Sequence, residues 1–367
     1  MSRPPSRALV LTASLIASAA LLYGCARDPE KRSASELAVS ASKSVLRTDS
    51  DMQTVLNKLA SFDAKAIEKT IPAQARQQPT IADAVKGVLA DQKRSADPAS
   101  LVPGVTTAER TLPGATGNLP ATVYTPSGSG PFPVVLYFHG GGWVIADRTV
   151  YDGGARGLAK QANAIVVSVD YRRAPENKFP AAHDDALAAY RWVANNAASL
   201  GGDPKRLALA GESAGGNLAL ATAIAAHSAG LTAPRHVLAV YPVAQTTTDT
   251  ESYLKYADAM PLNRPMMLWF VAQTTTSAAD LKDPRLDLVH ANLSGLPPVT
   301  LINAEIDPLR DDGAQLEQAL RTAGVSVERQ VYTGVTHEFF GTAAVVAKAQ
   351  QAQAYAGQRL KGDLAPK

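Results

Sequence analysis

The chain has 367 residues, of which 46% are hydrophobic and 19% are charged. This balance is typical of a globular protein with a sizeable core, and it excludes a disordered chain. The formal net charge is only +3, and no basic run lies beside stacked aromatic residues, so the sequence gives no case for nucleic-acid binding.

The N-terminus has the features of an export signal. Two arginines precede an apolar run over residues 8–22, which is short for a membrane span. The run closes on Leu22-Tyr23-Gly24-Cys25, which resembles the lipobox of bacterial lipoproteins, where cleavage precedes the cysteine and its sulfur receives a lipid. We therefore expect residues 1–24 to be a lipoprotein signal peptide and Cys25 to anchor the protein in the bacterial cell envelope, at the outer membrane facing the periplasm. The alternative is a plain cleaved signal, which would give a periplasmic or secreted protein.

A polar segment and a helical segment follow. Residues 25–50 are rich in Ser and Ala and lack periodicity, so we expect a tether. In residues 51–100, apolar side chains recur at helical spacing, and Pro72 and Pro79 divide the segment into short helices. These helices precede the first predicted strand, so we expect them to form one part of a cap.

Strands alternate with helices in residues 101–244 and again in residues 293–367. Apolar strands that alternate with helices are typical of a mainly parallel sheet with helices on both faces, which is an α/β fold. The predicted strands are 105–111, 121–124, 134–138, 164–169, 207–210, 237–243, 299–303 and 325–332, and the predicted helices are 153–161, 181–198, 217–227, 312–323 and 342–360.

Residues 245–292 interrupt this alternation. The segment is far longer than an ordinary connection, and such insertions usually fold over a binding site, so we expect it to be the second part of a helical cap. Its large side chains, with one tryptophan from a glycine-rich loop, are candidates for a substrate pocket; ordinary core packing is the alternative. These candidates are Trp143, Met267, Trp269 and Phe270.

A Gly-x-Ser-x-Gly pattern joins the strand 207–210 to the next helix. Ser213 lies at its centre, and this pattern is typical of a nucleophile elbow, in which the serine adopts a strained backbone at a sharp turn. Gly211 and Gly215 leave room for that turn. The N–H of Ala214 then lies at a helix start, where donors favour a developing anion.

Three consecutive glycines follow the strand 134–138, in His139-Gly140-Gly141-Gly142-Trp143. Glycines let the backbone approach a ligand and direct N–H groups at it, so this loop could bind the oxyanion of an acyl-transfer intermediate. A phosphate site is disfavoured because Lys and Ser/Thr do not follow at P-loop spacing. We expect His139 to orient the loop and not to act as a base.

A nucleophilic serine needs a base, and the base needs a carboxylate. His337 comes after the last predicted strand and Asp307 after the strand 299–303, and both positions fall at the carboxyl edge of a parallel sheet. The order Ser213, Asp307, His337 is that of α/β-hydrolases. Asp311 and Asp312 fit the cap and first turn of the next helix instead.

These motifs together resemble the hormone-sensitive lipase family of bacterial esterases. The resemblance implies an α/β-hydrolase fold, a catalytic Ser213, Asp307 and His337, and an oxyanion hole made by the N–H groups of Gly141, Gly142 and Ala214. His337-Glu338-Phe339 departs from the His-Gly-Phe that is usual in the family. The motifs are 139–143, Tyr171-Arg172-Arg173-Ala174-Pro175-Glu176 (which would support the oxyanion loop), 179–182, 211–215 and 307–309.

The expected function is serine-dependent hydrolysis of short- to medium-chain acyl or aryl esters through an acyl-enzyme. The same residues could act on an amide, carbamate or lactone, and a remote alternative is an inactive envelope-anchored binding protein. We expect no metal and no organic cofactor, because neither a His-Glu-x-x-His motif nor a cysteine cluster occurs. The oligomeric state is left open, with a homodimer as one outcome.

Overall fold

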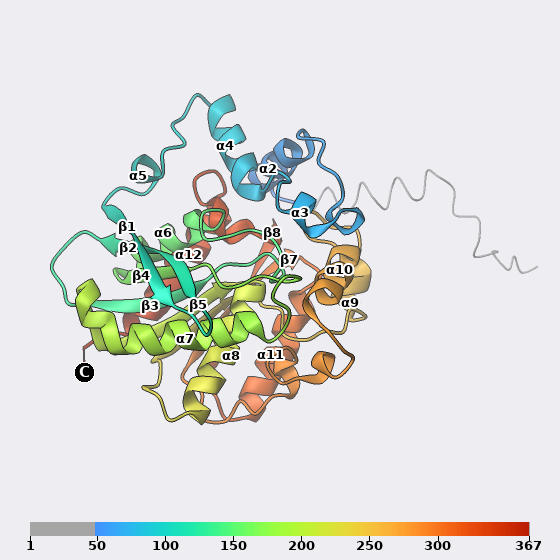
Figure 1. Ribbon diagram of the computed structural model, residues 1–367. Helices are drawn as coiled ribbons and strands as arrows, with labels where there is room; N and C mark the ends of the chain where they lie inside the picture. Colours follow the sequence, from blue (N-terminus) through green and yellow to red (C-terminus); the bar gives the residue numbers. More distant parts are fainter. Residues whose placement is uncertain (1–47, 367) are drawn as a thin grey trace, which may run out of the picture. The chain divides into compact units, whose positions relative to one another are not determined.

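A computed structural model describes residues 48–366 (Figure 1). The expected signal peptide, Cys25 and nearly all of the expected tether lie outside these residues. Within the described part, helices surround one eight-stranded sheet with the strand order β1-β2-β4-β3-β5-β6-β7-β8. The strands are β1 (Val105–Pro113), β2 (Asn118–Pro126), β3 (Phe132–Phe138), β4 (Ile165–Val169), β5 (Gly202–Glu212), β6 (His236–Val240), β7 (Val299–Ile306) and β8 (Val327–Thr336).

In the sheet, strands β4, β3, β5, β6, β7 and β8 run parallel to one another, and β2 runs antiparallel to both of its neighbours, β1 and β4. Its strands are apolar on both sides because helices cover both faces. In β3, Leu136 and Phe138 enter one core, and Tyr137 enters the other. The helices α7 (Ala181–Asn196), α8 (Ala214–Ser228) and α11 (Arg310–Thr322) cover the first face, and α6 (Asp152–Ala162) and α12 (Ala347–Asp363) cover the second.

The N-terminal helices divide between two places. Helices α2 (Ser50–Ala60) and α4 (Ile81–Asp91) pack on each other and join the core beneath α6 and α12. In contrast, η1 (Ile67–Lys69) contacts α10 (Arg264–Thr274) of the insertion. The remaining short helices are α3 (Pro72–Ala75), α5 (Pro98–Leu101), η2 (Ala197–Leu200), α9 (Glu251–Lys255), η3 (Asp280–Lys282), η4 (Leu288–His290) and η5 (Phe339–Thr342).

The last two strands are longer than the sequence predicted. We expected them to end near Asn303 and Tyr332, but a parallel ladder with a register shift continues to Ile306 beside Thr336. Asp307 and His337 therefore both follow directly on the final residue of a strand. The N–H of Asp49 also donates to the Gly334 carbonyl at 2.8 Å, which ties the start of α2 to the end of β8.

Within residues 48–366, no helix combines the length and the apolar character needed to cross a bilayer.

Candidate active site

The turn between β5 and α8 is a sharp elbow with Ser213 at its tip. Ser213 has φ of 56° and ψ of −118°, a strained conformation for a residue with a side chain. Its N–H donates to the Val240 carbonyl at 2.9 Å, which holds the elbow against β6. A Cβ on Gly211 would overlap the Gly215 carbonyl, so this turn requires glycine there, as predicted.

Ser213, His337 and Asp307 form a continuous chain of hydrogen bonds. The Ser213 Oγ lies 3.0 Å from His337 Nε2, and His337 Nδ1 lies 2.8 Å from Asp307 Oδ2. The other Asp307 oxygen accepts the Leu309 N–H at 2.8 Å. Because a carboxylate can only accept, His337 carries its proton on Nδ1 and offers Nε2 as the acceptor for the serine hydroxyl. The arrangement can therefore activate the serine as a nucleophile.

The glycine-rich loop beside Ser213 has an unusual backbone. Gly141, Gly142 and Trp143 have φ of 95°, 59° and 61°, so two of the three positions favour glycine directly. Among residues 48–366, the N–H groups of Gly141, Gly142 and Ala214 have no acceptor. Donors without a partner beside a nucleophile are what an oxyanion hole requires.

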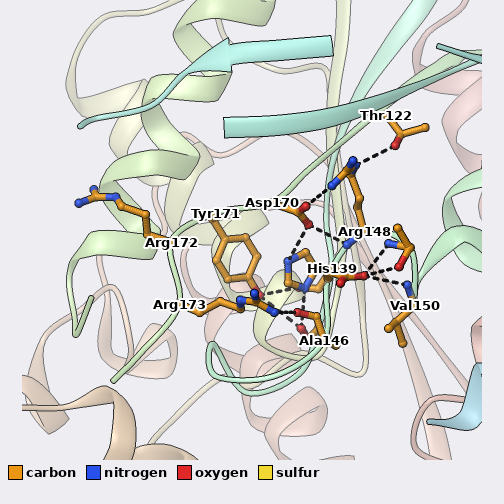
Figure 2. A network of polar contacts seen from close by, with 12 residues as sticks. Thr122, His139, Ala146, Arg148, Val150, Asp170, Tyr171, Arg172 and Arg173 are labelled. Atoms are coloured by element: carbon orange, nitrogen blue, oxygen red, sulfur yellow. Dashed lines mark hydrogen bonds and ion pairs between the residues drawn. The ribbon is translucent and has the colours of Figure 1, made fainter. Parts of the chain in front are cut away.

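A network of polar contacts holds this loop in place (Figure 2). The Tyr171 hydroxyl donates to the His139 carbonyl at 2.9 Å, and the two rings stack with centroids 4.3 Å apart. Arg148 donates its N–H to Asp170 at 2.8 Å and also pairs with that carboxylate through its guanidinium, while Arg173 donates to the Ala146 carbonyl. His139 is fully buried in this network and makes no hydrogen bond to Ser213, whose histidine partner is His337.

Arg76 ties the N-terminal segment to the same loop. Its Nε donates to the Val144 carbonyl and one Nη to the Ala174 carbonyl, both at 2.8 Å, and it forms an ion pair with Glu176. Nothing in the local sequence around Arg76 predicts this role, because its partners are about 70 to 100 residues away.

The insertion is tied to the loop that contains Asp307. Ser252 donates its hydroxyl to the Pro308 carbonyl at 2.6 Å and its N–H to Asp311 at 2.8 Å. Asp312 is buried and accepts the Ala244 N–H at 3.0 Å. Asp311 and Asp312 do lie in the first turn of α11, as predicted, but they bind distant backbone groups and do not cap the helix.

Two of the predicted pocket residues lie at the glycine-rich loop: Trp143 is part of it, and the Phe270 ring lies against Gly142. Trp143, Met267 and Phe270 are buried in one hydrophobic cluster. A Cβ on Gly142 would overlap the Phe270 ring, so this ring rests on the oxyanion loop. Trp269 is half-buried and packs edge-on against Phe270. Ser213 is 5% exposed, so the nucleophile is nearly buried.

Three other histidines have structural partners. His183 Nε2 lies 2.9 Å from the Asn217 side chain, His236 pairs with Asp363, and His290 pairs with Asp287. None of the three is hydrogen-bonded to Ser213, whose histidine partner is His337.

Two glutamates lie directly beside the triad. Glu212 is fully buried and accepts hydrogen bonds from Tyr137 and Tyr241, and Glu338 accepts one from Tyr151 at 3.0 Å. Burial raises the pKa of Glu212 to about 7, against the opposing effect of its tyrosine donors, and burial also raises the pKa of Glu338. A charged residue at the buried end of a strand was the only sequence signal for Glu212.

These carboxylates act on the catalytic histidine. Burial alone would lower the pKa of His337, but the charge and hydrogen bond of Asp307, with the charges of Glu338 and Glu212, outweigh it and raise that pKa above 6.5. Neutral His337 is the form that can accept the serine proton. Activity should therefore fall as the pH decreases through the pKa of His337.

Glu338→Gln should move the acidic limb of kcat/KM to lower pH. Glutamine keeps an acceptor for Tyr151 but removes a negative charge that stabilises protonated His337, so the pKa of His337 falls. The measurement is a pH profile with a soluble aryl ester. Glu328→Gln, which removes an exposed carboxylate from β8, should leave the limb in place. A limb that stays fixed in Glu338→Gln would contradict this assignment.

Comparison with known proteins identifies the family of the chain. A family model for the α/β-hydrolase fold matches residues 135–341. The chain belongs to this family. Carboxylesterase NlhH of Mycobacterium tuberculosis is 41% identical over 280 residues, which are 74% of this chain and 88% of that protein. An ethyl acetate hydrolase of Pseudomonas putida is 38% identical over 64% of this chain and 75% of its own length.

A solved esterase structure is also similar to the chain. A thermostable esterase from Pseudomonas putida ECU1011 superposes with a TM-score of 0.79 and 33% identity, covering 88% of this chain and 99% of that one. The resemblance to the hormone-sensitive lipase branch of the α/β-hydrolases is thereby confirmed.

Proposed function

We propose that the protein is a serine carboxylic-ester hydrolase in which Ser213 is the nucleophile, His337 the general base and Asp307 the residue that orients it. The observation that supports this most strongly is the hydrogen-bonded chain of these three side chains beside three backbone N–H groups without acceptors. Relatives named carboxylesterase and ethyl acetate hydrolase point to the same reaction.

The reaction begins when His337 Nε2 takes the proton of Ser213 as Oγ attacks the ester carbonyl. The N–H groups of Gly141, Gly142 and Ala214 stabilise the tetrahedral oxyanion, and each such donor contributes about 3 kcal/mol. His337 then gives its proton to the leaving alcohol. Water, activated by the same histidine, hydrolyses the acyl-enzyme and restores the serine.

Short- to medium-chain acyl or aryl esters are the proposed substrates. The nucleophile is nearly buried, and the Phe270 ring rests on the oxyanion loop, so the room beside Ser213 favours a small acyl group. The pocket is assigned to Trp143, Met267, Trp269 and Phe270.

A chain-length series tests the proposal. p-Nitrophenyl esters from acetate to palmitate should be hydrolysed, with the highest kcat/KM for short chains, and an organophosphate should stop hydrolysis by modifying Ser213, as located by peptide mass spectrometry. Hydrolysis of amides or lactones alone would assign the same machinery to another substrate class. Absence of both hydrolysis and labelling would leave the fold with a binding role.

The proposed location is the cell envelope, through a lipid on Cys25. The support is the apolar run of residues 8–22 and the Leu22-Tyr23-Gly24-Cys25 sequence. In a bacterial host, labelled palmitate should enter the wild-type protein, and Cys25→Ala should abolish the label and release the protein from the membrane fraction. Ser33→Ala is a matched control. An unlabelled wild-type protein in the soluble periplasm would favour the plain signal peptide.

A further inference from the structure

A cavity of about 640 Å³ lies on the face of the sheet that α6 and α12 cover. Its walls come from α4, α5, α6 and the start of α12, and Glu212 and Glu338 also contribute to them. Ser213, His337 and Asp307 do not line it. The predicted pocket residues Trp143, Met267 and Phe270 pack in the hydrophobic cluster of the opposite face. This cavity is therefore separate from the pocket of the catalytic serine.

Tyr151 and Glu338 separate the cavity from the catalytic loops. The Tyr151 hydroxyl donates to Glu338 at 3.0 Å, and the same hydroxyl lies so close to Gly140 that a Cβ there would overlap it. Glu338 directly follows His337 in the chain. A molecule in the cavity would thus touch side chains that also touch the base loop and the oxyanion loop.

One wall of the cavity is apolar. It is built from helices α4 and α5 and the connection that follows α5, and a wall of this kind suits a hydrocarbon body. The apolar residues on it are Ile81, Val85, Leu89, Leu101 and Val102.

The charges of the opposite wall are mostly paired. Asp152 pairs with Arg156 at 3.0 Å and Glu109 with Arg148 at 2.6 Å. Within residues 48–366, Glu212 and Glu338 have no cationic partner within ion-pair distance, and no protein group donates to the second oxygen of Glu338. Lys86 and Lys160 also line the cavity, but both are exposed and can keep their ammonium groups in water.

We propose that this cavity is a second small-molecule site that takes an amphipathic organic cation, with an amine head against Glu338 and Glu212 and an apolar body against α4 and α5. A protonated amine can donate to the second oxygen of Glu338, to which no protein group donates, and a charge-assisted hydrogen bond of this kind is stronger than a neutral one. A carboxylate head would meet two acidic side chains at the same place.

Octylamine and octanoate form a matched pair of probes, to be titrated into the full chain by calorimetry at about pH 8, where alkylamines are protonated. Octylamine should bind saturably, and octanoate should bind at least about tenfold more weakly. Glu338→Gln removes the charge and should weaken octylamine binding about tenfold. Val85→Trp should fill the cavity and weaken octylamine binding by at least about tenfold. Hydrolysis of p-nitrophenyl butyrate by this variant should stay unchanged.

Controls separate this site from the catalytic pocket. Leu101→Trp fills the same space from α5 and serves if Val85→Trp does not fold. Phe270→Ala changes only the opposite face, so the affinity for octylamine should stay within about twofold. The proposal is overturned if octylamine does not bind, binds no better than octanoate, competes with the ester substrate, or binds equally well after Val85→Trp and Leu101→Trp. Binding needs no catalysis, so organophosphate labelling of Ser213 tests the proposed hydrolysis separately.

Discussion

Asp307→Asn should lower kcat for ester hydrolysis by about 10⁴-fold, as the equivalent change does in another serine hydrolase. One Asp307 oxygen accepts the Leu309 N–H, so the carbonyl oxygen of asparagine will take that place. Its NH2 group then faces His337 Nδ1 and can only donate. Nδ1 must become an acceptor, which moves the proton to Nε2 and removes the acceptor for the Ser213 hydroxyl. Steady-state kinetics with a p-nitrophenyl ester measures the loss.

Asp312→Asn is the matched control for this change. Asp312 is also fully buried and also accepts a backbone N–H, from Ala244 at 3.0 Å, but it does not contact His337. Burial raises the pKa of Asp312, so a neutral amide suits its surroundings. We expect kcat to change only a few-fold. Similar losses in both variants would mean that Asp307 acts through folding and not through the tautomer of His337.

Gly215→Ala should destabilise the fold and the elbow together. The added Cβ would overlap the Phe138 carbonyl oxygen and lie 2.5 Å from that of His139, both of which are backbone atoms at the root of the oxyanion loop. Backbone cannot rotate away as a side chain can, so we expect a loss of about 3 kcal/mol in the free energy of unfolding. For a domain of this size the melting temperature should fall by about 5–10 °C.

Gly362→Ala tests whether the effect belongs to the elbow. A Cβ on Gly362 meets no atom within 4 Å, and the residue lies near the end of α12. Alanine is the better helix former, so stability should stay equal or rise by up to about 1 kcal/mol. Calorimetric melting of both variants measures the difference, and equal melting temperatures would contradict the predicted clash.

The sequence predicted those parts of the site that depend on local backbone geometry. The small residues around Ser213 follow from the sharp turn itself, and Asp307 and His337 were found because both follow predicted strands. The strand ends were misjudged because Glu305 and Gly334 have the character of turn residues. The ladder is irregular at this point, where the Gly334 N–H donates to the Glu305 carboxylate, and it resumes with Ile306 beside Thr336 only because β7 and β8 are neighbours in the sheet.

Contacts between distant segments gave no such signal. Arg76 reaches the oxyanion loop, and Arg148 reaches Asp170, yet no periodicity or motif connects these positions. The helical period of residues 81–91 shows that α4 buries one face, but it does not say against what. The structure places that face on the α6–α12 side of the sheet and not above Ser213.

The position of β8 has a consequence for how activity is lost. β8 is an edge strand of the sheet, and His337 follows its last residue, whereas Ser213 lies at the end of the central strand β5. Sheet margins open locally at lower free energy than strands with two neighbours. The hydrogen bond from Asp49 to Gly334 and the ion pair between Asp49 and Lys348 stabilise this edge of the sheet. Activity therefore depends on the local stability of β8 and of the loop that carries His337. We expect activity to be lost when this region opens, before the central sheet unfolds.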